Sequence, residues 1–242
     1  MVTCGGAPTS ALRALQAATQ SLLLTTRRLT ELDVRRPSLL PGWSRAHVLS
    51  HLAGNAEGGT RLLEGVVSGM PGWEYRDLAS RATDIETGSH DPVAVLVARV
   101  EATAQRFDDA CVRVLPEQWA TPVTWTTGHQ NAAREVVTSR LFEVEIHHVD
   151  LATGRTLDDW PNDLVATVFD VVVEALKSRA DFPPMTLQLD DHPDSRTLGE
   201  SSSPLVVAGS RADVLTWLLG RSDGHTLRVS GGHRVPSLPD LY

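Results

Sequence analysis

The sequence predicts an α+β fold, in which a four-helix bundle at residues 1–156 precedes a small α+β domain at residues 157–242. Two observations support this prediction. Apolar residues recur at helical spacing through the first two thirds of the chain, in segments long enough for bundle helices. After Gly154 the pattern changes to short apolar runs bounded by turn residues, which is typical of strands.

The first two bundle helices are expected at residues 9–32 and 44–69. Ser44 is a favourable N-cap for the second helix, and Gly69 marks its end. The first helix is expected to bury a stripe of apolar side chains at helical spacing, formed by Leu12, Leu15, Ala18, Leu22, Leu29 and Leu32.

The third and fourth bundle helices are expected at residues 91–116 and 131–154. Pro92 falls at the first helical position of the third helix, where its missing N–H costs nothing. Gly154 is expected to end the fourth helix.

Two connections are longer than a bundle requires. Residues 70–90 are predicted to contain a short amphipathic helix at 76–85, and residues 117–130 to form a loop that carries Trp119 and Trp125. Long ordered loops often form lids or binding loops. They can equally well cover one end of the bundle, and the sequence leaves both interpretations open.

The second domain is predicted to contain two helices and three strands. Pro161 stands near the start of the first helix, and Gly220 ends the second. In chain order the elements are a helix at 161–180, strands at 185–191 and 203–210, a helix at 211–221 and a strand at 225–231.

The composition is that of a soluble globular protein, with 41% apolar and 21% charged residues. The formal net charge of −8 argues against nucleic acid as a partner, because nucleic-acid binding needs clustered Lys and Arg. No apolar run approaches the roughly 20 residues that span a bilayer, and MVTCGGAPTS lacks the regions of a secretion signal. Cys4 and Cys111 suggest no disulfide framework, so we expect a cytoplasmic protein, as a monomer or weak oligomer.

One stretch of the fourth helix concentrates ionisable side chains in an otherwise apolar segment. It reads TSRLFEVEIHHVDLATG and carries Glu143, Glu145, His147, His148 and Asp150. Such groups on a buried face cost free energy unless they are paired or bind a metal. Glu143 and His147 are four residues apart and so lie on one helix face, but Glu145 and His148, three apart, also share a face. Spacing alone does not choose between these pairs, and solvated or helix-stabilising roles stay open for each residue.

A third metal ligand is predicted at His51, in WSRAHVLSHLAGNAE of the second helix. Two histidines and one carboxylate form a zinc site with an open fourth position, which is the arrangement of catalytic zinc. Asp150 would either orient His147 from behind or stabilise the helix end. The remaining histidines are predicted not to be ligands: His47, His90, His129, His192, His225 and His233.

The chain resembles the mycothiol-dependent maleylpyruvate isomerases of actinobacteria, within the broader DinB-like superfamily. The resemblance rests on four segments that occur in the same order across nearly the whole chain: LLPGWSRAHVLSHLAGNA, SRATDIETG, LFEVEIHHVDL and PLVVAGSRADVLTWLLGRSDG. It implies an N-terminal DinB-like four-helix bundle and a small C-terminal α/β domain with a sterol-carrier-like fold. It also implies a place in the gentisate pathway of aromatic catabolism.

The resemblance also implies the residues of the site. The zinc ligands of the family fall on His51, Glu143 and His147, which favours this glutamate–histidine pair over the alternative. Two functional arginines of the family correspond to Arg81 and Arg221, with substrate and mycothiol carboxylates as their targets.

The mechanism expected from this resemblance uses a thiol. Zinc with three protein ligands leaves one position for water or a thiol, and a zinc-bound thiol is held as the nucleophilic thiolate. No cysteine lies in the metal motifs, so the thiol must come from a cofactor, which the resemblance identifies as mycothiol. Its thiolate would add to the cis double bond of maleylpyruvate, and rotation and elimination would give fumarylpyruvate. Arg81 and Arg221 would hold the two carboxylates of this small dicarboxylate substrate through paired hydrogen bonds.

Two other functions stay open at this point. The first is a mycothiol S-transferase, which would use the same thiolate on another electrophile. The second is a non-enzymatic, zinc-stabilised bundle that binds a small ligand or a regulatory partner, although an open metal position counts against it. The residues that line the site would separate the first alternative from the isomerase, in particular Trp73, Tyr75, Trp119 and Trp125.

Overall fold

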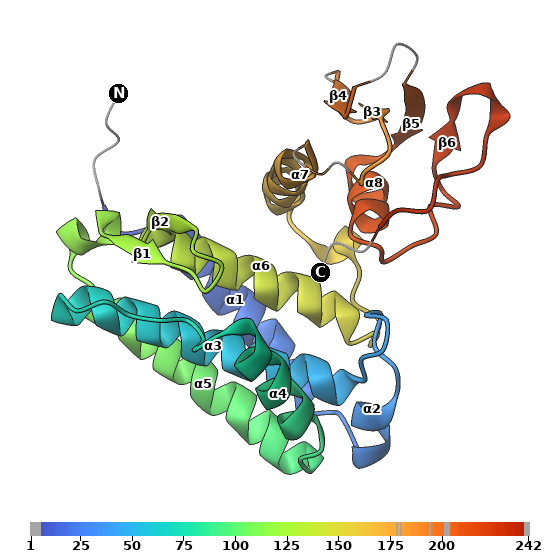
Figure 1. The fold of residues 1–242 in the computed structure, drawn as a ribbon. Coiled ribbons are helices and arrows are strands. Elements are labelled where there is room, and N and C mark those ends of the chain that lie inside the picture. Colours follow the sequence, from blue (N-terminus) through green and yellow to red (C-terminus); the bar gives the residue numbers. More distant parts are fainter. Residues whose placement is uncertain (1–5, 178, 180, 194, 201–203, 240–242) are drawn as a thin grey trace. The chain divides into compact units, whose positions relative to one another are not determined.

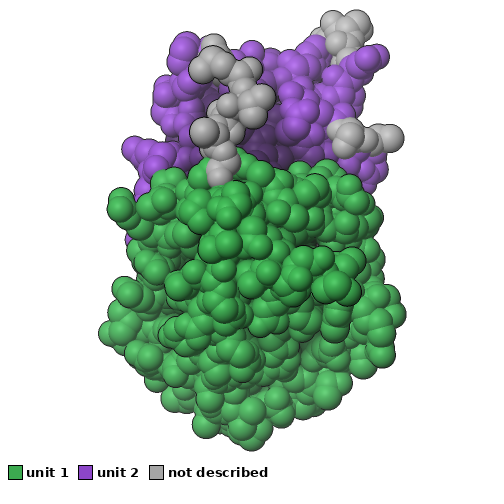
Figure 2. All heavy atoms as spheres, turned by 90° about the vertical axis from the view of Figure 1, so that its left-hand side faces the viewer, with its two compact units in different colours: residues 1–153 green, residues 154–242 purple. Residues whose placement is uncertain are grey.

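The computed structural model describes residues 6–177, 179, 181–193, 195–200 and 204–239 of the chain. The chain divides into two compact units, residues 1–153 and residues 154–242 (Figures 1 and 2). The first unit is helical, and the second combines a mixed sheet with helices. The predicted α+β class is therefore confirmed. No helix among the described residues is both long enough and apolar enough to cross a membrane.

The first unit is built on the long helices of its described residues (Figure 1). Helix α3 packs against α5 and α6, and α1 packs against α6 and α5. Buried side chains from all four helices form the core between them, and Leu22, Leu52, Phe107 and Val137 are each at most 1% exposed. The long helices are α1 (Thr9–Thr26), α3 (Arg45–Ser68), α5 (Val93–Arg113) and α6 (Arg134–Asp150), and the short ones are α2 (Glu31–Arg35) and α4 (Leu78–Ser89).

The prediction of one helix over residues 9–32 was wrong. Helix α1 ends at Thr26, and the extended backbone of Thr30 starts the separate helix α2. Thr30 and Asp33 form a capping box, in which each side chain accepts a hydrogen bond from the other residue's backbone N–H. This local capping competes successfully with continuation of the helix, and it leaves Leu32 69% exposed rather than in the buried stripe.

The other helix limits were predicted with differing success. Helix α3 has Ser44 as its N-cap and Gly69 as its C-cap with φ of 72°, as predicted. Pro92 is the N-cap of α5 instead of its first helical residue. Helix α4 was predicted at 76–85 and is longer, because the Asp77 side chain caps it at the start and it continues to Ser89.

The start of the fourth predicted helix was wrong because a β-hairpin precedes it. Strands β1 (Pro122–Thr124) and β2 (Gln130–Ala132) pair antiparallel after the 3₁₀ helix η1 (Pro116–Ala120). Helix α6 therefore begins only at Arg134. It ends at Asp150, four residues before the predicted stop at Gly154, because Ala152 already turns the chain with φ of 49°.

The second unit contains a four-stranded sheet in its described residues, with strand order β4-β3-β5-β6. Strands β3 and β5 are parallel, and the other neighbours are antiparallel. Helix α7 packs against α8 and β4, and Phe169, Leu187 and Val207 are buried in this unit. The elements are η2 (Leu157–Asp159), α7 (Asn162–Lys177), β3 (Met185–Leu189), β4 (Ser195–Leu198), β5 (Leu205–Gly209), α8 (Arg211–Leu218), β6 (Arg228–Val229) and η3 (Ser230–Gly232).

Strand β4 was not predicted. It lies at the edge of the sheet and reads SRTL, and only Leu198 of its residues is buried, so it lacks the apolar alternation that marks a strand. The predicted helix at 161–180 ends at Lys177, and residues 178 and 180 lie outside the described residues, as does Ser203 of the strand predicted at 203–210.

Candidate metal centre and the adjoining pocket

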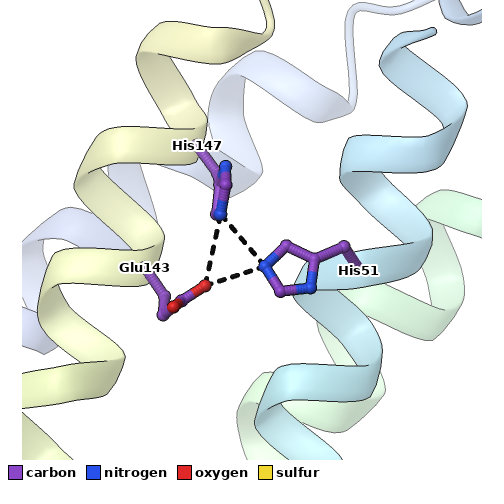
Figure 3. Close-up of side chains that lie close together, drawn as sticks. All are labelled: His51, Glu143 and His147. Carbon is purple, nitrogen blue, oxygen red and sulfur yellow. Dashed lines mark hydrogen bonds and ion pairs between the residues drawn. The ribbon is translucent and has the colours of Figure 1, made fainter. Parts of the chain in front are cut away.

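Helices α3 and α6 bring three predicted ligands together. His51 projects from α3, and Glu143 and His147 project toward it from one face of α6 (Figure 3). His51 Nε2 lies 2.8 Å from Glu143 Oε2 and 3.0 Å from His147 Nε2, and His147 Nε2 lies 3.2 Å from Glu143 Oε2. Among the described residues, this is the group of three histidine, cysteine or acidic side chains that is close enough to share one metal ion.

The donor set fits a divalent metal. Ligand atoms of a tetrahedral zinc, each about 2.0–2.1 Å from the ion, are roughly 3.3 Å apart. The three separations of 2.8, 3.0 and 3.2 Å are close to that spacing. His51 and His147 are 2% and 4% exposed, but the side chain of Glu143 is 25% exposed. The centre is therefore held by buried ligands and can still be reached beside the carboxylate.

At least two of the three groups are in the protonation state that binds a cation. Burial lowers the pKa of His51 to about 4, so its imidazole is neutral near pH 7. Burial acts to raise the pKa of Glu143, but hydrogen bonds with His147 and His51 outweigh it and hold this pKa well below the ordinary value. Glu143 is therefore ionised, and its carboxylate contacts the imidazoles of both His51 and His147.

Asp150 orients His147 from the side opposite the centre. Its Oδ2 lies 2.8 Å from His147 Nδ1, and the Asp150 side chain is fully buried. Burial acts to lower the pKa of His147, and the hydrogen bonds with Asp150 and Glu143 outweigh it and raise this pKa. With Nδ1 donating to Asp150, Nε2 of a neutral His147 presents its lone pair to the centre, as in carboxylate–histidine–metal arrangements.

Glu145 and His148, the alternative pair on α6, are not part of this group. His148 Nε2 lies 2.8 Å from Thr25 Oγ1, so this imidazole points toward α1 and not toward α3. His47, one turn before His51, contacts Ser44 and Glu86 instead, with its Nε2 3.1 Å from Glu86 Oε2. Geometry therefore separates two pairs that spacing could not.

A pocket of about 210 Å³ adjoins the centre within the first unit. His51 forms part of its wall, together with Tyr75, Arg81, Trp73 and Arg61. Arg81 is on the first turn of α4 and its Nη2 lies 3.2 Å from His51 Nδ1. The structure thus places one of the two predicted functional arginines directly against a candidate metal ligand.

Glycines of α3 let the segment that carries the pocket aromatics lie flat on this helix. A Cβ at Gly58 would come within 2.9 Å of the Glu74 carbonyl oxygen, and one at Gly65 within 2.4 Å of the Gly72 nitrogen. Thr126 of the β1–β2 hairpin holds the segment from the other side, because its Oγ1 accepts from Tyr75 N at 3.1 Å and donates to Glu74 Oε2 at 2.9 Å.

The four aromatic residues singled out in the sequence have different roles. Tyr75 and Trp73 line the pocket, and the Arg61 guanidinium stacks on the Trp73 ring at 4.3 Å from its centroid. Trp119 is only 1% exposed and belongs to the core. Trp125 is half-buried in the hairpin turn and does not line the pocket.

Arg221 lies in the second unit, just after α8. Gly220 turns the chain with φ of 73°, and the Arg221 guanidinium donates to the carbonyl of Leu219 at the helix end. Its predicted role toward substrate stays a prediction.

Arg140 is a buried residue near the centre that sequence analysis missed. It is 3% exposed on α6, three residues before Glu143, and its Nη1 donates to Leu52 O and Asn55 Oδ1 at 2.9 and 2.8 Å. Arg140 is three residues before Glu143 and seven before His147, so all three lie on the same face of α6. This spacing could have identified Arg140 from the sequence.

The described cysteine does not provide a reactive thiol. Cys111 on α5 is buried, and burial raises its pKa to about 12, so the thiol is protonated near pH 7. Cys4 lies outside the described residues.

Comparisons with known proteins agree over both units. Residues 15–152 match the model of the mycothiol maleylpyruvate isomerase N-terminal domain, and residues 159–239 match the C-terminal domain of the same family. The solved structures of a mycothiol-dependent maleylpyruvate isomerase and of its histidine-to-alanine mutant each share the fold, with a TM-score of 0.91, 24% identity and coverage of 96% of both chains. No curated protein sequence matches. The chain belongs to the mycothiol maleylpyruvate isomerase family.

Proposed function

We propose that this protein is a zinc- and mycothiol-dependent cis–trans isomerase that converts maleylpyruvate to fumarylpyruvate. The observation that carries this proposal is the convergence of His51, Glu143 and His147 at a reachable centre, beside a pocket that contains Arg81. When bound, the metal would keep a thiol ionised, and the thiolate would supply reversible addition to the conjugated cis double bond.

The chain's own residues would hold and orient the reactants. His51, Glu143 and His147 would bind the metal, and Asp150 would fix the ring of His147 so that Nε2 faces it. These three ligands leave one coordination position for the thiol. The 25% exposure of the Glu143 side chain gives access to that position.

Arg81 would bind one carboxylate of the substrate. Its guanidinium already lies at the pocket wall beside His51, and planar guanidinium groups bind carboxylates through two parallel hydrogen bonds. Arg221 would bind the other carboxylate, which is the role that the family resemblance suggests. Binding of both carboxylates would orient the double bond of the substrate toward the thiol.

The test is turnover by the purified, zinc-loaded protein. With mycothiol present, maleylpyruvate should be converted to fumarylpyruvate, and omission of mycothiol or removal of zinc should stop the conversion. His51→Ala should be inactive under the same conditions. Turnover of other electrophiles to mycothiol adducts, without isomerisation of maleylpyruvate, would instead assign the protein as a mycothiol S-transferase.

A further inference from the structure

The pocket beside the candidate metal centre contains a hydroxyl group without an acceptor. Tyr75 Oη is shielded from solvent and has no hydrogen-bond acceptor among the described residues. Arg81 Cζ lies 5.7 Å from the centroid of the Tyr75 ring, but a guanidinium can only donate hydrogen bonds. The phenolic hydrogen therefore lacks an acceptor, which is rare for a buried polar group in a folded protein.

A second buried donor near this hydroxyl is also unpaired. Arg140 Nη2 has no partner within the part of the chain that the structure describes, although its Nη1 is fully used. Burial lowers the pKa of Arg140 to about 10, against the opposing effect of the nearby Glu143 charge. Two buried donors of this region thus lack an acceptor, as expected where a ligand supplies the missing oxygen.

We propose that the hydroxyl of Tyr75 is an oxygen-binding group of this site, which donates a hydrogen bond to a carbonyl or carboxylate oxygen of the bound ligand. The inference rests on the proposed function and deepens it. In that reaction, addition of sulfur to the double bond moves the π electrons toward the oxygen of the conjugated ketone, and elimination returns them. Tyr75 would bind this oxygen most strongly while it is negative.

The hydroxyl acts as a hydrogen-bond donor and keeps its proton throughout. Burial raises the pKa of Tyr75 well above its ordinary value of 10, and this effect exceeds the opposing one of the Arg81 charge. Since the addition and its reversal need no net proton, a donor that stays protonated is sufficient. Tyr75 is therefore distinct from an acid–base residue, and its effect should not depend on pH between 6 and 9, roughly the range below the ordinary tyrosine pKa.

Metal binding to His51 would release Arg81 for the ligand. Arg81 Nη2 donates to His51 Nδ1, so that nitrogen holds a lone pair and Nε2 carries the hydrogen. A metal bound to Nε2 requires the hydrogen of the neutral imidazole to be on Nδ1. The N–H of His51 Nδ1 and the N–H of Arg81 Nη2 would then face each other, and two donors cannot form a hydrogen bond. Arg81 would leave His51 and bind a ligand carboxylate in the pocket that Tyr75 also lines.

Tyr75→Phe tests the proposal, because it removes the hydroxyl and keeps the ring. We expect kcat of the zinc-loaded enzyme to fall roughly 100-fold, as for loss of one oxyanion donor, with zinc content unchanged. The melting temperature should stay the same or rise, because an unpaired buried group is removed. Trp160→Phe is the control: its buried Nε1 also lacks a partner among the described residues, in the second unit, and kcat should not change.

A binding measurement separates this inference from the proposed function. Maleate is titrated by calorimetry into zinc-loaded wild type and Tyr75→Phe without mycothiol, and the variant should bind about tenfold more weakly, the loss of one hydrogen bond. Equal affinities, or no binding by either protein, would overturn the inference. Wild type that binds maleate through Tyr75 but does not isomerise maleylpyruvate would overturn the proposed function alone. Isomerisation with equal kcat in wild type and Tyr75→Phe would overturn the inference alone.

Discussion

Two sides of helix α6 each carry a buried histidine, and the two histidines have different partners. On one side Glu143 and His147 meet His51 of α3, with three ligand atoms within 3.2 Å of one another. On the other side His148 is just as buried, at 2% exposure, but its partner is the hydroxyl of Thr25 on α1. Burial of an imidazole therefore does not identify a metal ligand. The neighbouring helix does, since α3 offers a further histidine and α1, the other helix packed on α6 in the described structure, has none.

The partners of the two imidazoles differ in the same way. His147 Nδ1 faces the carboxylate of Asp150, which fixes the ring and makes Nε2 a better donor to a metal. His148 Nε2 faces a neutral hydroxyl, which satisfies a buried polar group and links α6 to α1. The first arrangement supports a metal centre and the second supports the bundle.

The largest expected difference between the two sides is in metal content. His51→Ala should lose the metal and all isomerase activity, because two protein ligands do not retain a catalytic ion. His148→Ala should keep one metal per chain and lose stability, by roughly 2 kcal/mol from the lost packing and the lost hydrogen bond to Thr25. Elemental analysis and thermal unfolding of both variants measure the contrast. Metal loss in His148→Ala with retention in His51→Ala would reverse the assignment of the two sides.

The orienting partners should differ by a smaller factor. Asp150→Asn should weaken zinc binding by about 10–100-fold, the usual effect of removing a carboxylate behind a ligating histidine. Thr25→Val, which removes the equivalent partner of His148, should leave zinc affinity unchanged. Competition with a chromogenic chelator measures both constants. An equal effect of the two substitutions would show that Asp150 is a helix-end residue without a role in orienting His147.

Arginine-to-lysine substitutions test the ligand side of the centre. Lysine keeps the charge but loses the planar two-point grip, so Arg81→Lys should reduce kcat/KM for maleylpyruvate by about tenfold or more. Arg221→Lys should behave in the same way if it holds the second carboxylate. Arg113→Lys, whose guanidinium pairs with Glu64 and does not line the pocket, is the matched control. Wild-type values for both Arg81→Lys and Arg221→Lys would leave the isomerase without a carboxylate clamp and favour the S-transferase.

The smallest expected effect is a shift in the pH dependence of zinc binding. The pKa of His147 is raised and that of His51 is lowered to about 4, so protons compete with zinc first at His147. Zinc affinity should be level above the raised pKa of His147 and fall with a slope of one proton as pH drops through it. Asp150→Asn removes the main interaction that raises this pKa, so the midpoint should move to lower pH. A midpoint that stays in place would show that another group titrates.

The sequence correctly predicted those features that depend on periodicity and on capping residues. Ser44 and Gly69 limit α3 because they are local signals, and the spacing of Glu143 and His147 is a property of any helix. It failed where partners distant in the chain decide the structure. Strand β4 forms because β3 offers an edge, although SRTL has little strand character of its own.

The site, like the fold, was predictable from the sequence only where the helical pattern places its residues. The ligand pair could be proposed from α6 alone, but its choice over Glu145 and His148 needed either the family resemblance or the position of α3. Tyr75 could not be placed, because it belongs to a non-helical segment held by Thr126 and by the glycines of α3. No periodic pattern encodes such a position.

Metal K-edge X-ray absorption of the purified protein tests the central claim most directly. It should show one zinc per chain with two imidazole nitrogens and carboxylate or water oxygen at about 2.0–2.2 Å, and no sulfur. Addition of mycothiol should introduce one sulfur at about 2.3 Å, with both imidazoles retained. Sulfur ligands before the thiol is added, or fewer than two imidazoles in the wild type, would contradict a centre made of His51, Glu143 and His147.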